Sequence, residues 1–132
     1  SPDIFDVLAY ARKISTLPSA SLEQECRLSE RAYKESKSDK TRLQYALLLS
    51  LPGGCNDNAH ALKLLQEPAA ADAKGLNDLA SWLKRWISET RELNERMLAL
   101  EERHRAMLTK NEELQHKLDR LLEIERRLLE RK

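Results

Sequence analysis

The chain has 132 residues, of which 23 are Lys or Arg and 22 are Asp or Glu, so its net charge is +1. This balance argues against electrostatic binding of nucleic acid, which needs a basic excess or a basic face. Only three Gly and four Pro occur, which favours an all-α protein over a loop-rich or all-β one. No run approaches the roughly 18 apolar residues of a membrane span.

All seven of these helix breakers lie in the first 75 residues, which predicts short helices there. Apolar residues recur at helical spacing over 4–14. Ser21 and Gln24 have the spacing of a capping box, which predicts the start of a second helix. A third helix follows a cap at Ser38 or Asp39.

Residues 43–51 are apolar on nearly every side, which predicts a helix at the centre of the core. Asn56 or Asp57 caps a fourth helix, which ends at Pro68. Short helix pairs with small contact residues are typical of tetratricopeptide-like hairpins, although no 34-residue repeat can be aligned. We therefore expect a helical-hairpin domain at residues 1–75.

Residues 76–132 contain neither Gly nor Pro and predict one long coiled-coil helix. Apolar residues alternate by four and three, and eight successive heptad d positions are apolar: Leu79, Trp86, Leu93, Leu100, Met107, Leu114, Leu121 and Leu128. Four Glu-to-cation pairs at i,i+4 support the helix: Glu92–Arg96, Glu101–Arg105, Glu113–Lys117 and Glu123–Arg127. We expect Trp82 and Trp86 to pack this helix onto the short ones.

The a positions of this helix are more polar than the d positions and include Thr90, His104, Asn111 and Glu125. An Asn at an a position favours a partner in register. A homodimer is therefore conceivable, but in a parallel pair only Arg96 would meet an opposite charge across the seam. The charge pattern of this helix therefore gives little support to self-association.

Towards the C-terminus the apolar surface becomes wider than a two-stranded coiled coil needs. We expect it to bind a helical-bundle partner, with Glu125 as the specificity element because a desolvated carboxylate needs a cation. The alternative is that these leucines only close the protein's own coil. The predicted partner-binding residues are Leu114, Leu118, Leu121, Leu122, Ile124, Glu125, Arg126, Leu128, Leu129 and Arg131.

The segment 114–132 resembles the end of the coiled coil in the QseG (YfhG) family of proteobacterial envelope lipoproteins. The matching pattern is L-x-x-I-E-R-x-L-x-x-R-K, which begins at Leu121 and ends at Lys132. Upstream, Leu83-Lys-Arg-Trp86 and the short helices with two cysteines resemble the organisation of that family.

The resemblance implies a periplasmic accessory protein attached to the outer membrane. Members of the family act with a membrane histidine kinase and its response regulator, QseE and QseF (GlrK and GlrR). The protein would bind the sensor domain of the kinase and promote two-component signalling. Membrane contact would come only from a lipid anchor outside these residues, preceding Ser1.

In an exported protein, Cys26 and Cys55 can pair, and the resemblance favours this disulfide over two free thiols. His104 and His116 each follow a Glu by three residues, but one helix separates them by about 18 Å, too far to share a metal pair. We find no phosphate-binding loop or nucleophile motif and expect neither a cofactor nor an enzyme. The alternative hypothesis is a cytoplasmic coiled-coil scaffold or dimeric adaptor with reduced cysteines.

Overall fold

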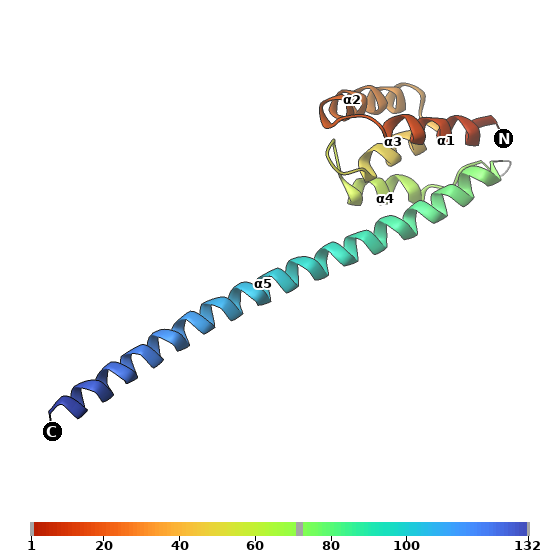
Figure 1. Ribbon diagram of the computed structural model, residues 1–132. Coiled ribbons are helices and arrows are strands. Elements are labelled where there is room, and N and C mark those ends of the chain that lie inside the picture. The colour runs from red at the N-terminus through yellow and green to blue at the C-terminus, as the bar shows by residue number, and fades with distance from the viewer. Residues whose placement is uncertain (1, 71–72, 132) are drawn as a thin grey trace. The chain divides into compact units, whose positions relative to one another are not determined.

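The computed structural model describes residues 2–70 and 73–131 and confirms an all-α fold of short helices followed by one long helix (Figure 1). No strand occurs within these two ranges. The helices are α1 (Pro2–Ile14), α2 (Ser19–Ser36), α3 (Asp39–Ser50), α4 (Asn58–Gln66) and α5 (Lys74–Glu130). The chain divides into two compact units, one ending at Arg91 and the other beginning at Glu92.

Side-chain caps set the starts of α3 and α4. Ser38 caps α3 in a capping box with Thr41, and the Asp57 side chain accepts the backbone N–H of His60 at the start of α4. The predicted capping box at Ser21 is wrong, because α2 already begins at Ser19. Extended Pro18 precedes it and accepts the backbone N–H of Leu22 at 3.0 Å, so Ser21 lies inside the first turn.

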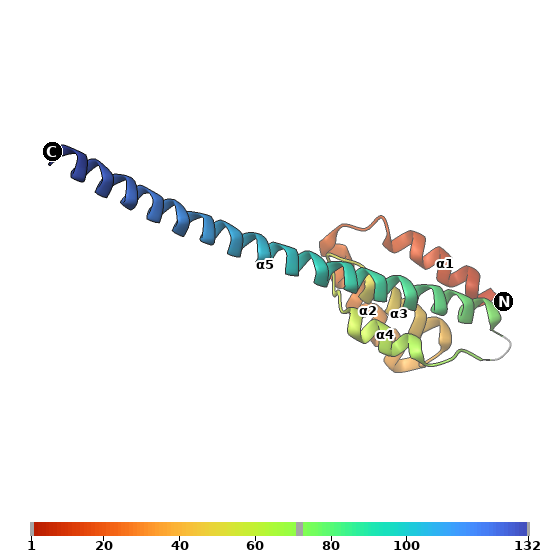
Figure 2. The ribbon, with the colours of Figure 1, turned by 90° about the horizontal axis from the view of Figure 1, so that it is seen from below.

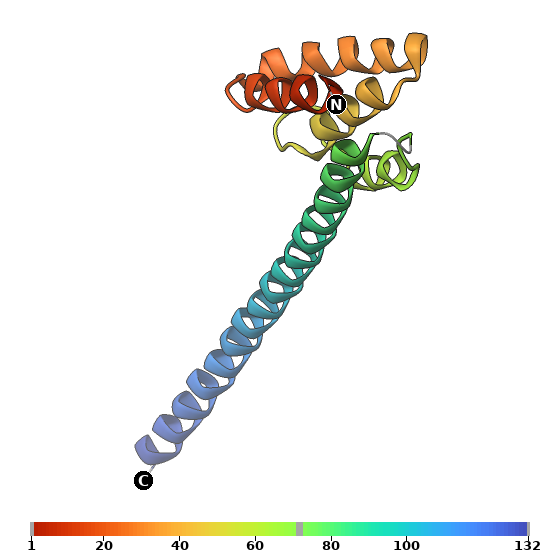
Figure 3. The ribbon, with the colours of Figure 1, turned by 90° about the vertical axis from the view of Figure 1, so that its right-hand side faces the viewer.

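Helix α3 is the centre of the first unit, as its nearly all-round apolar sequence predicts. It contacts α1, α2 and α4, and eight of its residues are buried. Leu43 and Leu48 are each only 1% exposed. Figure 3 shows α1 and α2 side by side, where the Tyr10 hydroxyl joins them by donating to Glu25 Oε1 at 2.9 Å.

The first turns of α5 complete this core through a stripe formed by Leu76, Ala80, Leu83 and Ile87, all of which are buried. Figure 2 shows the start of α5 near the N-terminal end of α1, and a Cβ atom at Gly75 would lie 3.3 Å from Ile4 Cγ1. The compact unit thus extends past the start of α5, whereas we expected a domain boundary at residue 75.

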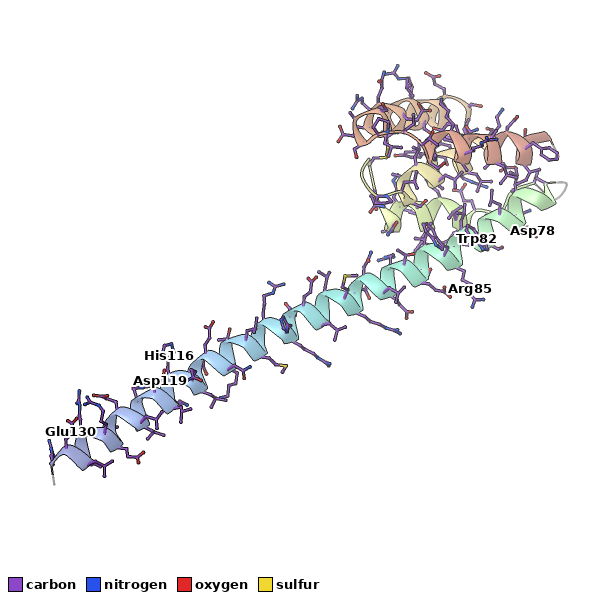
Figure 4. The ribbon with its side chains drawn as sticks, viewed as in Figure 1. Asp78, Trp82, Arg85, His116, Asp119 and Glu130 are labelled. Carbon is purple, nitrogen blue, oxygen red and sulfur yellow. A yellow bond between two sulfur atoms is a disulfide. The ribbon has the colours of Figure 1, made fainter. Side chains whose placement is uncertain are left out.

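The tryptophans differ from the expectation that they pack α5 onto the short helices. Trp82 and Trp86 are 61% and 41% exposed and stack on each other, with ring centroids 6.3 Å apart. Figure 4 shows Trp82 on the side of α5 nearer the short helices and Arg85 on the other side. The buried stripe lies on a neighbouring face, so these two rings only border the core.

Cys26 and Cys55 form a disulfide that ties the α3–α4 loop to α2. The loop lies close to α2 at Gly54, where a Cβ atom would be 3.0 Å from Leu22 Cβ. The preceding Gly53 has a φ of +90°, a conformation that favours glycine. Two glycines and the disulfide therefore fix this loop against α2.

The second unit consists of the part of α5 from Glu92 onward. Every residue described in this unit is exposed apart from the partly buried Glu123. None of the helices described is long and apolar enough to cross a membrane. This unit has no core of its own, so its stability as a lone helix depends on local pairs and on whatever contacts it.

Candidate protein-interaction surface

One face of the second unit carries a continuous row of exposed apolar side chains, which we call the α5 stripe. Heptad spacing places its members on one side of the helix. Their exposed fractions run from 49% at Leu118 to 63% at Met107 and Leu121. The members are Leu93, Met97, Leu100, Met107, Leu114, Leu118, Leu121 and Leu128.

The stripe widens near its C-terminal end. Leu122, Ile124 and Leu129 flank it at the neighbouring e and g positions and are 54%, 53% and 62% exposed. All ten residues predicted to bind a partner are exposed, including Glu125 and Arg131. The alternative that these leucines close the protein's own coil is not realised within this single chain.

The polar side of the last turns is held by ion pairs within the helix. Arg126 contacts Glu123 and Glu130, each at 2.6 Å, and Arg127 contacts Glu123 at 3.3 Å. The hydrogen bond from Arg126 lowers the pKa of the Glu123 carboxyl. Arg126 is thus engaged by acids of its own helix.

Glu125 lies within the stripe and pairs with no cation among the described residues. Exposure leaves its carboxylate solvated in the free chain. A partner that covers the stripe must either supply a cation here or leave a buried charge unpaired. This position therefore has the geometry to discriminate between partners.

The other candidates for chemistry are scattered. His104 and His116 are exposed on the second unit, and His116 extends from the same side of α5 as Asp119 (Figure 4). His60 packs edge-on against the Tyr45 ring at 5.5 Å between centroids. No group of three or more His, Cys, Asp or Glu side chains that could hold a metal occurs within the described ranges.

The first unit contains an apolar cavity of about 160 Å³ that the sequence did not predict. Trp82, Trp86 and Leu83 of α5 line it together with Ile14 of α1 and Leu47 of α3. The only signal in the sequence is the pair of tryptophans one helical turn apart. Such a pair is buried in the core or lines a cavity depending on which face of α5 packs against the short helices.

Comparison of this chain with models of protein families, with curated proteins and with solved structures finds no match.

Proposed function

We propose that this protein is a periplasmic accessory protein whose α5 stripe binds the sensor domain of a membrane histidine kinase and promotes two-component signalling. The observation that carries this proposal is the row of half-exposed leucines and methionines on a helix that contains no core of its own. Large exposed apolar patches on soluble proteins mark interaction sites.

Burial of the α5 stripe is the driving force that we expect for binding. Covering a leucine side chain completely contributes about 1.5–3 kcal/mol, so half-exposed members contribute roughly half of that each. The eight members together contribute roughly 6–12 kcal/mol, which is of the same order as the about 4–15 kcal/mol that association costs, so binding requires most of the stripe to be covered. An amphipathic helix that lays its apolar face in a groove is a recurrent mode of recognition.

The width of the stripe favours a helical-bundle partner. Leu122 and Leu129 on one edge and Ile124 on the other broaden the C-terminal end beyond one seam. Packing between two or more helices needs that width. Glu125 then requires a cation on the partner, which limits the partners that fit.

Two further points support the compartment and the kinase. The Cys26–Cys55 disulfide is of the kind that persists in oxidising compartments such as the periplasm. The segment 114–132 resembles the coiled-coil end of the QseG family, which acts on a kinase sensor domain. As an activator, the protein would bind the signalling state of the sensor domain more tightly than the resting state.

Calorimetric titration of the full chain with the purified sensor domain tests this proposal. We expect the double substitution Leu121→Asp and Leu128→Asp to abolish binding, because it places two charges in the buried part of the interface. Glu125→Lys should do the same by placing like charges opposite each other. The disulfide-linked first unit should stay folded in both variants, as checked by near-ultraviolet circular dichroism.

Leu98→Asp is the matched control, because Leu98 is 62% exposed but lies on a heptad b position outside the stripe. It should bind like the wild type. Equal loss of binding in Leu98→Asp, or unchanged binding in both stripe variants, would place the interface elsewhere. A stable homodimer that does not bind the sensor domain would favour the adaptor function instead.

A further inference from the structure

Four cations form a row along one edge of the α5 stripe, which we call the basic edge. Arg96, Arg103, Lys110 and Lys117 follow one another at seven-residue intervals. Seven residues are close to two helical turns, so the four side chains lie about 10.5 Å apart along the same edge. All four are exposed.

The structure leaves this row without ion pairs. Within the described ranges, the pairs of the second unit involve only Glu123, Arg126, Arg127 and Glu130. The pairs that the sequence predicts for Arg96 with Glu92 and for Lys117 with Glu113 are not formed. The basic edge is therefore open to charges from another molecule.

A second copy of the chain does not match this row. In a parallel pair, Arg96 faces Glu101 of the other helix, but Arg103 faces Leu108 and Lys110 faces Gln115. In an antiparallel pair the row would face itself, and like charges across a seam are destabilising. Charge complementarity thus argues for a different protein.

We propose that the partner presents a helix with Asp or Glu side chains at seven-residue intervals, opposite Arg96, Arg103, Lys110 and Lys117. This inference rests on the proposed function and specifies the chemistry of the partner. The other edge of the stripe carries neutral residues such as Asn94, Leu108 and Gln115, with Glu101 as its one charge. An acidic row on one side only would fix both the direction and the register of the partner helix.

Two synthetic peptides test this chemistry directly with the full chain. Both have leucine at every a and d position, and they differ only in having glutamate or lysine at every e and g position. Like charges at the e and g positions keep each peptide from pairing with its own copy, so its leucine face stays free to bind the α5 stripe. We expect the glutamate peptide to bind about tenfold more tightly at low salt, with a difference that shrinks as salt is added. Equal binding, or tighter binding of the lysine peptide, would overturn the proposal.

Charge-reversal variants test which residues of α5 cause the preference for the glutamate peptide. The edge variant carries Arg103→Glu, Lys110→Glu and Lys117→Glu, and the control variant carries Arg91→Glu, Arg105→Glu and Arg120→Glu. Both change the net charge equally, but the control residues lie away from the stripe. The edge variant should lose or reverse the preference for the glutamate peptide, whereas the control should keep it. An equal loss in both would mean that only net charge matters, and would overturn the proposal.

The kinase sensor domain distinguishes this inference from the proposed function. If the glutamate peptide is selected but the sensor domain does not bind, the basic edge stands and the proposed function fails. If the sensor domain binds wild type and edge variant equally, the proposed function stands and the acidic-partner inference is overturned.

Discussion

Tyr10 is a polar link inside the first unit. Its hydroxyl donates to Glu25 Oε1 at 2.9 Å, and Lys13 Nζ lies 3.5 Å from the same oxygen. Burial raises the pKa of Tyr10 well above the ordinary value of 10.0. The folded protein therefore holds the neutral phenol, which can donate to the carboxylate.

This shift predicts a loss of stability in alkaline solution. Above pH 10, Tyr10 ionises in the unfolded chain but stays protonated in the folded one, so the free energy of unfolding falls as the pH rises. At neutral pH, Tyr10→Phe should cost about 1 kcal/mol for the lost hydrogen bond. Urea unfolding of both proteins at neutral and alkaline pH, followed by tryptophan fluorescence, measures both effects.

Tyr45 has a pKa that is also raised by burial, so part of the alkaline loss should remain in Tyr10→Phe. The difference in stability between wild type and variant should narrow above pH 10. A constant difference across that range would show that Tyr10 does not cause the alkaline loss.

Individual residues differ in how far their roles could be predicted. Ser38 and Asp57 were predictable as caps because a cap depends on a few neighbouring residues. Arg42 was not, because its 6% exposure and its ion pair with Glu67 depend on how α3 meets the end of α4. Contacts between distant segments leave no local pattern in the sequence.

Helix α5 contains two apolar stripes with different roles. Ile87 is 1% exposed in the core of the first unit, whereas Leu93, six residues later, is 60% exposed in the α5 stripe. Ile87→Ala should destabilise the first unit by about 2–4 kcal/mol, because it leaves a cavity in a packed core. Leu93→Ala removes a similar side chain from an exposed site and should change stability by less than about 0.5 kcal/mol.

Thermal or urea unfolding monitored by near-ultraviolet circular dichroism checks this pair, because the aromatic residues of the chain lie in the first unit. Similar losses in Ile87→Ala and Leu93→Ala would contradict the division of α5 into a core stripe and an exposed stripe.

The length of α5 was predictable, but its packing face was not. The lack of Gly and Pro after residue 75 predicts an uninterrupted helix, as observed. The heptad register, however, places Trp86 at a d position, where it is 41% exposed, whereas Ala80 and Ile87 at e positions are buried. In the first turns of α5 the neighbouring apolar faces overlap, so the position of the short helices determines which face is buried.

The two compact units differ in what they contain. The first holds all the buried residues among those described, and the second holds the α5 stripe. The stripe itself could be predicted from heptad spacing, since a repeating apolar face on a helix is a local property. Its coiled-coil pairing stays a prediction, because pairing needs a second helix and the described residues of this chain place none against it.

Hydrogen exchange of residues 92–131 tests the central claim most directly, because it reports whether this helix is covered. The full chain is measured alone and with a saturating amount of the kinase sensor domain. We predict fast exchange in the free chain, since an isolated helix opens readily, and strong protection around Leu114–Leu128 in the complex. Protection in the free chain that does not change when the sensor domain is added would contradict the account.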